Sequence, residues 1–416
     1  MNVEELVRRS LREQAEEAAP VDAGFADRVL AVRRRRRTRR RRTRRIASVA
    51  AATAAVVGIA VAVPLLDRGE GDARPAVGLR TDGVQARPDQ SPPRDVIGAG
   101  RTVLAAHYTS ELHVRSEKRG SIQRTYWLLD PRTGTYKKDT RWAFVAVAPG
   151  ARTAAVLERG LPAHRIGLLD LASGRVERWI PVQHGVGGLA FSDDGSRLVA
   201  TTYAEDPDAR RKEKVQGPDG PVWQWDSGYG RSSRSGFYVL DVARGTGSWS
   251  AVPADRTVNA RQDFAFSRAG DHVYAQYVGG RDGLQQFYSL DGSKTAAPAE
   301  EEHLRSDVPA RLSPDGRLAA LGLSKEVDGD PGRSYSSVLD PRTGKEITKV
   351  RGADLLAWAD DKRLIAWERV TGLDEPYRPR LVLVTLGSDK VVPLSGVREP
   401  DEDMLRRNWE PVFARR

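Results

Sequence analysis

The chain has 416 residues, a mass of 45.7 kDa and a formal net charge of +11, and it contains no cysteine. The absence of cysteine excludes a disulfide framework and any lipid anchor attached to a cysteine side chain. A domain that folds without disulfides needs a large core, and the chain is long enough to build one.

The first 45 residues predict a short basic head with helical character. Apolar residues from Val3 to Ala15 recur at helical spacing, and Pro20 ends this pattern. Asp22 is placed to cap a second, shorter helical turn. Such a small amphipathic piece is either a solvated or membrane-lying helix or a docking helix for a cytoplasmic partner.

A block of positive charge closes the head. Residues 33–45 contain eleven arginines and two threonines, and residues 1–45 as a whole carry a net +8 from 15 Arg and 7 acidic residues. Such a block on one flank of an apolar segment fixes the orientation of that segment in a membrane and attracts anionic lipid. The orienting arginines are Arg33, Arg34, Arg35, Arg36, Arg37, Arg39, Arg40, Arg41, Arg42, Arg44 and Arg45.

Residues 46–66 predict a single transmembrane helix. These 21 residues are uncharged, and at about 1.5 Å per residue they span roughly the 30 Å hydrocarbon layer of a bilayer. The flank from Asp67 to Glu70 is nearly neutral, so we expect the N-terminus in the cytoplasm and the rest of the chain outside. The alternative is an export signal cleaved near Ala62, because Ala60–Ala62 has the small-x-small form of a cleavage site.

The remaining residues carry only +3, so the basic character of the chain is local to its head. We therefore expect a membrane partner and no nucleic-acid partner. Residues 67–95 contain Pro75, Pro88, Pro92 and Pro93 and show no apolar period, which predicts an extended linker.

Two short elements recur from Val96 onward. The first is an apolar run, a turn that usually ends in Gly, and a second apolar run; the turn glycines are Gly100, Gly150, Gly195, Gly270 and Gly316, with Asp361 in the sixth copy. The second is a strand that ends in Asp before a turn, with copies at Asp130, Asp170, Asp241, Asp291 and Asp340. An aspartate that closes a strand accepts hydrogen bonds from turn N–H groups, so we expect these carboxylates to be structural.

A period near 45 residues with four short strands is typical of a β-propeller blade. We therefore expect an all-β, six-bladed propeller over residues 96–396, with seven blades as the alternative, preceded by the transmembrane helix and the helical head. The tail, residues 397–416, either adds a strand that closes the ring or lies free on the surface.

The Ser-Pro-Asp-Gly-Arg-Leu-Ala stretch at 313–319 and the Leu-Asp-x-x-Thr-Gly turns resemble the repeats of TolB-type and WD-repeat-like propellers. The whole plan resembles that of single-pass, propeller-bearing membrane proteins of high-GC actinobacteria. The resemblance implies a fold and no particular ligand, because the Gly-His and Trp-Asp pairs of true WD repeats are absent from the strand ends.

The longest variable loop, residues 204–235, is the predicted partner-binding segment. It concentrates aromatic residues, flanked by arginines, where loop length is greatest. The candidate binding residues are Trp223, Trp225, Tyr229, Arg231 and Arg234. An insertion that folds its own aromatic residues onto a blade is the alternative. On the binding hypothesis, deletion of residues 206–232 abolishes partner capture and leaves the melting temperature nearly unchanged.

The sequence shows no catalytic, metal or cofactor motif, so we predict none of these sites. The six histidines are scattered, and we expect His107 and His113 at the surface. Acidic residues around Gly329 predict a solvated turn, with a calcium site as the alternative. The predicted function is a non-enzymatic, extracytoplasmic binding or scaffolding module for an unknown protein or ligand. The alternatives are a transmembrane signalling regulator whose head captures a cytoplasmic factor, and a hydrolase or lyase with polar residues in a central funnel.

Overall fold

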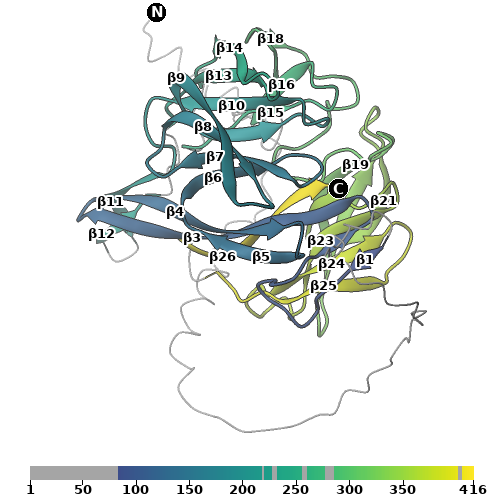
Figure 1. Ribbon diagram of the computed structural model, residues 1–416. Coiled ribbons are helices and arrows are strands. Elements are labelled where there is room, and N and C mark those ends of the chain that lie inside the picture. Colours follow the sequence, from purple (N-terminus) through teal and green to yellow (C-terminus); the bar gives the residue numbers. More distant parts are fainter. Residues whose placement is uncertain (1–82, 218–219, 227–231, 255–259, 277–284, 402–404) are drawn as a thin grey trace, which may run out of the picture. The chain divides into compact units, whose positions relative to one another are not determined.

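A computed structural model describes residues 83–416, apart from residues 218–219, 227–231, 255–259, 277–284 and 402–404 (Figure 1). The chain divides into two units, Met1–Asp72 and Ala73–Arg416, and everything described belongs to the second. The predicted head, transmembrane segment and first part of the linker lie outside the described residues. Within the described residues every regular element is a strand, and none of them forms a helix suited to cross a bilayer.

The first sheet is built from both ends of the described chain. The C-terminal strand β26 lies on one edge of β3, and β4 and then β5 lie on the other. The tail after residue 396 is therefore not free, because it adds a strand to the sheet. The strands are β1 (Val84–Gln85), β2 (Gly98–Ala99), β3 (Thr102–Ser116), β4 (Arg119–Asp130), β5 (Thr135–Asp139) and β26 (Arg406–Arg415).

The middle of the chain forms a seven-stranded sheet with one strand shared between its halves. The first part of β9 (Arg175–Phe191) pairs with β8, and its last part pairs with β10. The other strands are β6 (Trp142–Val147), β7 (Thr153–Glu158), β8 (Ala163–Asp170), β10 (Arg197–Tyr203), β13 (Arg234–Asp241) and β14 (Thr246–Ala251). Between β10 and β13 the chain leaves the sheet to form a hairpin of β11 (Ala209–Gly217) and β12 (Gly220–Trp225).

Three antiparallel meanders complete the described chain. One contains β15 (Ala265–Phe266), β16 (His272–Gln276), β17 (Gln285–Ser289) and β18 (Lys294–Thr295). The next contains β19 (Ala319–Val327), β20 (Arg333–Leu339) and β21 (Glu346–Arg351). The last contains β22 (Asp354–Trp358), β23 (Arg363–Arg369), β24 (Pro379–Thr385) and β25 (Val391–Val397).

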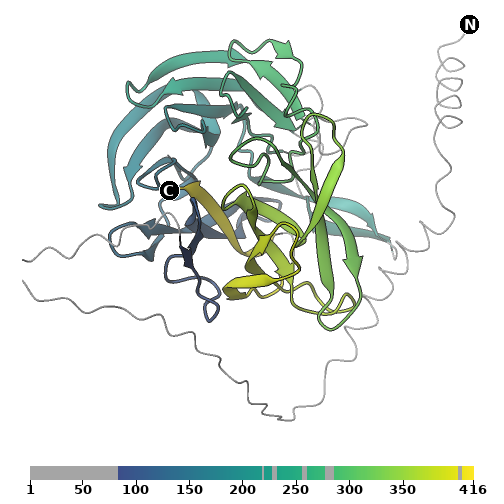
Figure 2. The same cartoon turned by 90° about the vertical axis from the view of Figure 1, so that its right-hand side faces the viewer.

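Buried apolar clusters join each meander to a neighbour, and the last joins the first. Trp409 of β26, for example, packs in one cluster with Ile97 and with Ile365 and Leu383 of the last sheet. Figure 2 shows the sheets of this unit following one another in chain order. The described chain is thus an all-β, propeller-like succession of meanders, and the expected fold class holds at this level.

The repeated turns adopt the local geometry that the sequence predicts. Gly195 and Gly316 have φ angles of 73° and 75°, a conformation that glycine reaches without steric cost. Asp130 accepts a hydrogen bond from the backbone N–H of Arg132 at 2.9 Å, and Asp340 does the same for Arg342 at 2.9 Å. These aspartates cap turns, as expected from their repetition.

The second part of the predicted linker is folded rather than extended. In residues 83–95, the Gln90 side chain is buried, and its Oε1 accepts hydrogen bonds from the N–H groups of Arg94 and Asp95. Arg87 N–H also donates to the carbonyl of Leu394 at 2.8 Å. This correction has a physical reason: side-chain-to-backbone bonds close the proline-containing segment into a compact turn that packs against the last sheet.

The expectation that His107 lies at the surface is wrong, because its side chain is completely buried, whereas His113 is exposed as expected. Its strand β3 lies between β26 and β4, so the imidazole stacks on Trp127 at 5.2 Å and packs edge-on against Trp409. Its Nε2 lies 3.0 Å from the carbonyl oxygen of Pro93. Burial lowers the pKa of His107 to about 4, and the hydrogen bond to Pro93 opposes that shift in part.

Candidate functional site

The insertion hairpin is attached to a distant part of the chain. Strand β11 pairs antiparallel with β4, with Ala209 opposite Ser121 and Arg211 opposite Arg119. The ends of β3 and β4 and the hairpin β11–β12 therefore form one four-stranded projection, which we call the arm (residues 110–124, 209–217 and 220–225). Figure 1 shows the arm at the left, with β11 and β12 beside the tip of the β3–β4 hairpin.

Two aspartates fasten the base of the arm. Ser121 Oγ donates to Asp206 Oδ2 at 2.9 Å, and the Asp208 carboxylate pairs with Arg124 at 2.6 Å and with Arg261 at 2.8 Å. Burial alone would raise the pKa of Asp208, but the Arg261 and Arg124 guanidinium groups outweigh it and hold that pKa well below its usual range.

The ion-pair network continues toward the seven-stranded sheet. Arg261 also pairs with Asp263 at 2.9 Å and donates to the carbonyl oxygen of Gly187 at 2.6 Å. Tyr203 Oη donates to Asp263 at 2.8 Å. Deletion of residues 206–232 would remove Asp208 and leave two largely buried guanidinium groups without it. We therefore expect this deletion to lower the melting temperature, contrary to the expectation from the sequence, because the base of the insertion forms buried ion pairs.

The outer part of the arm presents a basic and aromatic face. Trp223 and Trp225 alternate along β12, and the register places Lys214 opposite Trp223 and Lys212 opposite Trp225. Lys118 Nζ lies 4.6 Å from the centroid of the Trp223 ring. We call the set Lys118, Lys212, Lys214, Trp223 and Trp225 the basic-aromatic face. The Trp223 side chain is 51% exposed there, and Trp225 is half-buried.

The structure separates the other predicted binding residues from this face. Tyr229 and Arg231 lie outside the described residues. Arg234, expected among the exposed interface residues, is only 5% exposed, because it starts β13 opposite Tyr203 and points into the fold. Its Nε donates to the carbonyl of Val252 at 3.3 Å, and its guanidinium lies 4.3 Å from the Phe264 ring centroid.

Sequence reasoning missed Asp206, Asp208 and the contribution of the β3–β4 hairpin. One signal was available in the sequence: residues 102–130 contain a single glycine, Gly120, and no proline, which favours two strands longer than those of the other repeats. A hairpin of that length must extend beyond its sheet.

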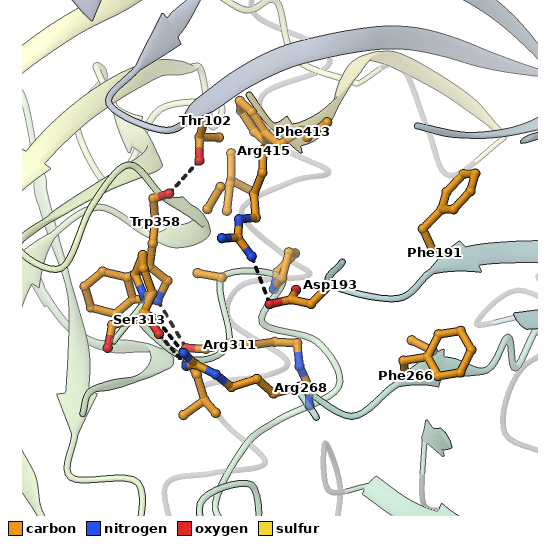
Figure 3. A pocket seen from close by; sticks show the side chains of 18 of the residues that line it. Thr102, Phe191, Asp193, Phe266, Arg268, Arg311, Ser313, Trp358, Phe413 and Arg415 are labelled. Carbon is orange, nitrogen blue, oxygen red and sulfur yellow. Dashed lines mark hydrogen bonds and ion pairs between the residues drawn. The ribbon is translucent and has the colours of Figure 1, made fainter. Parts of the chain in front are cut away.

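A separate cavity of about 350 Å³ is lined by the innermost strands and their turns (Figure 3). Phe191 of β9, Phe266 of β15 and Phe413 of β26 contribute aromatic rings to its wall. Four arginines and two acids supply the charged groups; they are Arg101, Arg268, Arg311, Arg415, Asp193 and Glu301. The funnel-enzyme alternative predicts polar residues at inner-strand ends, and this cavity contains such residues.

The charged side chains of the cavity form defined contacts. Glu301 is buried, accepts a hydrogen bond from the Arg268 N–H at 2.8 Å and pairs with Arg311. The Arg311 guanidinium lies 3.9 Å from the Tyr274 ring centroid. At the rim, Arg415 pairs with Asp193 at 3.1 Å, and both side chains are more than half exposed.

No group of His, Asp or Glu suited to bind a metal ion occurs among the described residues. Glu326, the first acidic residue of the possible calcium loop, lies 3.8 Å from Arg369 Nε and accepts a hydrogen bond from Ser334 Oγ. Glu326 thus has a guanidinium and a hydroxyl group as neighbours, as in an ordinary ion-paired turn.

No family model and no curated protein matches this sequence. Among solved structures, the chain is similar to TolB from Acinetobacter baumannii, with 16% identity, a TM-score of 0.38, and coverage of 74% of this chain and 66% of that one. It is also similar to hydrazine synthase of Kuenenia stuttgartiensis, with 13% identity, a TM-score of 0.35, and coverage of 60% of this chain and 65% of that one.

The Cps50 (Swd1) β-propeller domain of Myceliophteria thermophila gives 13% identity and a TM-score of 0.34, with coverage of 80% and 99%. The chain thus spans slightly less than two thirds of the first two structures. Similarities at this level show nothing about the function of this chain.

Proposed function

We propose that this chain is a non-enzymatic, membrane-anchored binding module, with a six-bladed propeller outside the cell and an acidic protein segment as the ligand of its arm. The observation that carries the proposal is the half-exposed Trp223 beside three lysines on a projecting sheet. The charged residues of the basic-aromatic face are all lysines. On the opposite face of the arm, by contrast, Arg211 lies 3.5 Å from the carboxylate of Glu205.

Six blades follow if β9 is divided between two of them. Blade two then holds β6, β7, β8 and the start of β9, and blade three holds the end of β9 with β10, β13 and β14. In blade five the innermost strand is reduced to the bridge between Leu312 and Ala319. In blade one the innermost strand is the C-terminal strand β26, which pairs with β3. The two ends of the domain thus share one blade, and this closes the ring.

The arm offers two kinds of binding group. A large aromatic side chain beside cations is typical of protein interfaces, where Trp is enriched at the energetic centre. Strand β12 is the last strand of its sheet among the described residues, so its outer edge suits an added strand from a partner. An acidic, extended segment can pair with the edge of β12 through its backbone and with the lysines through its carboxylates.

The arm ends far from the place where the described chain begins and ends. The described chain begins beside its own end, because Arg416 donates to the carbonyl of Gly83 at 3.0 Å and its N–H donates to Arg101 at 2.8 Å. Thr102 starts β3 there, and Ser116 ends β3 in the arm, 14 residues later. At about 3.3 Å per residue these points are separated by roughly 45 Å.

Both acids of the cavity are paired with arginines, which suits anion binding better than general acid–base catalysis. This arrangement supports a binding module over the funnel-enzyme alternative.

Photo-crosslinking in intact cells tests the proposal. A photoreactive residue at Gln224, in the full chain, should capture one acidic protein. The Trp223→Ala variant should reduce that crosslink about tenfold or more, since an interface anchor contributes about 2 kcal/mol or more. Ile347→Ala, a truncation of another exposed apolar side chain, is the control and should have no effect.

A second variant separates binding from folding. Replacement of residues 214–223 by a short turn removes the tip but retains Asp206, Asp208 and the pairing with β4. It should abolish the crosslink and leave the melting temperature unchanged. An undiminished crosslink to the same protein in both variants would contradict the assignment of the arm.

A further inference from the structure

The boundary between the β15–β18 sheet and the β19–β21 sheet is unlike the others. Apolar clusters join the other consecutive sheets, including the last to the first. Among the described residues, no apolar cluster joins this pair. Arg268 and Tyr274 from one side meet Arg311 and Glu301 from the other instead. Polar contacts of this kind stabilise a boundary less than apolar packing does, and here they place charged groups at the wall of a cavity.

The backbone at this boundary is strained as well. Arg311 has a φ of 49°, in the left-handed region that residues with a Cβ rarely adopt. Its conformation keeps the guanidinium over the Tyr274 ring and against Glu301, at the wall of the central cavity. Strain of this kind persists where the surrounding structure holds a side chain in a required position, and it concentrates at binding sites.

The cavity combines a net positive wall with an aromatic one. Four arginines face two acids among its lining residues, and Figure 3 shows Phe191 and Phe266 lying across the cavity from Arg268 and Arg311. Arg101, at the turn before β3, is an exposed member of the set. Guanidinium groups bind carboxylates and phosphates in planar, two-point geometry, and aromatic rings bind a flat apolar body.

We infer that the central cavity is a binding site for a small molecule that carries a carboxylate or phosphate on a flat, apolar body. The cavity volume of about 350 Å³ lies at the lower end of the range for small-molecule sites, which limits the ligand to roughly one or two rings. Arg101 and Arg415 bind the anionic group at the rim, and Phe191 and Phe413, both partly exposed, contact the apolar body. Asp193 competes with the ligand for Arg415. This site is separate from the arm, and neither proposal depends on the other.

Calorimetric titration of the full chain at constant ionic strength tests the inference. Phenyl phosphate and benzoate are the anionic aromatic probes, and inorganic phosphate and benzyl alcohol each lack one of the two features. We expect phenyl phosphate or benzoate to bind more tightly than either single-feature probe, and the ratio of the two affinities identifies the preferred anion. Absence of saturable heat with both aromatic anions would overturn the inference.

Three variants assign the binding to the cavity. Arg101→Gln should weaken binding of the tighter probe about tenfold, the loss expected for one charge-assisted hydrogen bond. Arg317→Gln removes the same charge from an exposed arginine that does not line the cavity, and it should leave the affinity unchanged.

Asp193→Asn removes the competing carboxylate and should tighten binding severalfold, a change of sign that partial unfolding would not produce. Equal affinities in Arg101→Gln and Arg317→Gln, or weaker binding in Asp193→Asn, would place the ligand elsewhere and refute the site.

Discussion

Asp208 shows how a single carboxylate holds two distant parts of this chain together. It lies in the insertion, yet both of its arginine partners come from other segments, β4 and the link before β15. Its side chain is only 5% exposed, so its charge depends on these partners rather than on water.

We expect Asp208→Asn to lower the free energy of unfolding at pH 7 by about 3–5 kcal/mol, because two largely buried guanidinium groups lose their shared carboxylate. The pKa of Asp208 in the fold lies well below the value of about 3.9 in an unfolded chain. The ionised form therefore stabilises the fold above about pH 4, and this stabilisation is lost as the pH falls toward the folded pKa.

Denaturant titrations at pH 7 and pH 3 measure the effect. The difference between Asp208→Asn and the parent chain should be smaller at pH 3. Asp389→Asn, at an exposed position, is the control and should change the unfolding free energy by less than about 0.5 kcal/mol. Equal effects of the two substitutions would show that the network at Asp208 contributes nothing.

His107 predicts a second dependence on pH. Its pKa is about 4 in the fold and about 6.5 in an unfolded chain, so the unfolded chain binds more protons between these values. Stability should fall as the pH decreases from about 6.5 to about 4, with a loss of roughly 3 kcal/mol. His107→Gln should remove this part of the dependence, whereas His113→Gln, at an exposed position, should retain it. Unfolding free energies of the two variants, measured between about pH 4 and pH 6.5, test this prediction.

At the scale of elements, β26 closes the first sheet and brings Trp409 into the core. Trp409 is fully buried, packs edge-on against Trp367 at 5.0 Å and donates from Nε1 to Ser91 Oγ at 3.0 Å. The strand thus connects the C-terminus to the last sheet and to the folded part of the predicted linker.

Trp409→Ala should lower the free energy of unfolding by about 3–5 kcal/mol, because it leaves a large cavity in a core cluster. A chain that ends at Asp401 should fail to unfold cooperatively, since β3 then exposes an unpaired edge. Trp223→Ala, the same substitution at an exposed site, should change stability by less than about 0.5 kcal/mol. Equal losses in the two tryptophan variants, measured by thermal unfolding, would contradict this role of β26.

The repeated elements were predictable from the sequence because their causes are local. A glycine at positive φ and an aspartate that caps its own turn need only a few neighbouring residues. The attachment of the arm was not predictable, because Ser121 and Asp206 are 85 residues apart and neither has a local signature. The burial of Arg234 and His107 has the same explanation, since each depends on which strands flank its own.

The orientation of residues 46–66 decides on which side of the membrane the rest of the chain lies. A C-terminal alkaline phosphatase fusion should be active and a C-terminal green fluorescent protein fusion dark, because positive charge stays in the cytoplasm. Replacement of the eleven arginines of residues 33–45 by glutamine should mix the two orientations, whereas replacement by lysine should not. Phosphatase activity confined to the cytosol in the parent chain would refute the proposed location, and the size of the mature protein tests cleavage near Ala62.

The meeting of Gly83 with Arg416 has a practical consequence for how this protein is handled. Any tag, fluorophore or fused enzyme added at the C-terminus emerges next to Gly83 and the rim residue Arg415, whereas the arm extends away from this point. Immobilisation through the C-terminus therefore leaves the arm accessible to partners, but it crowds the mouth of the central cavity.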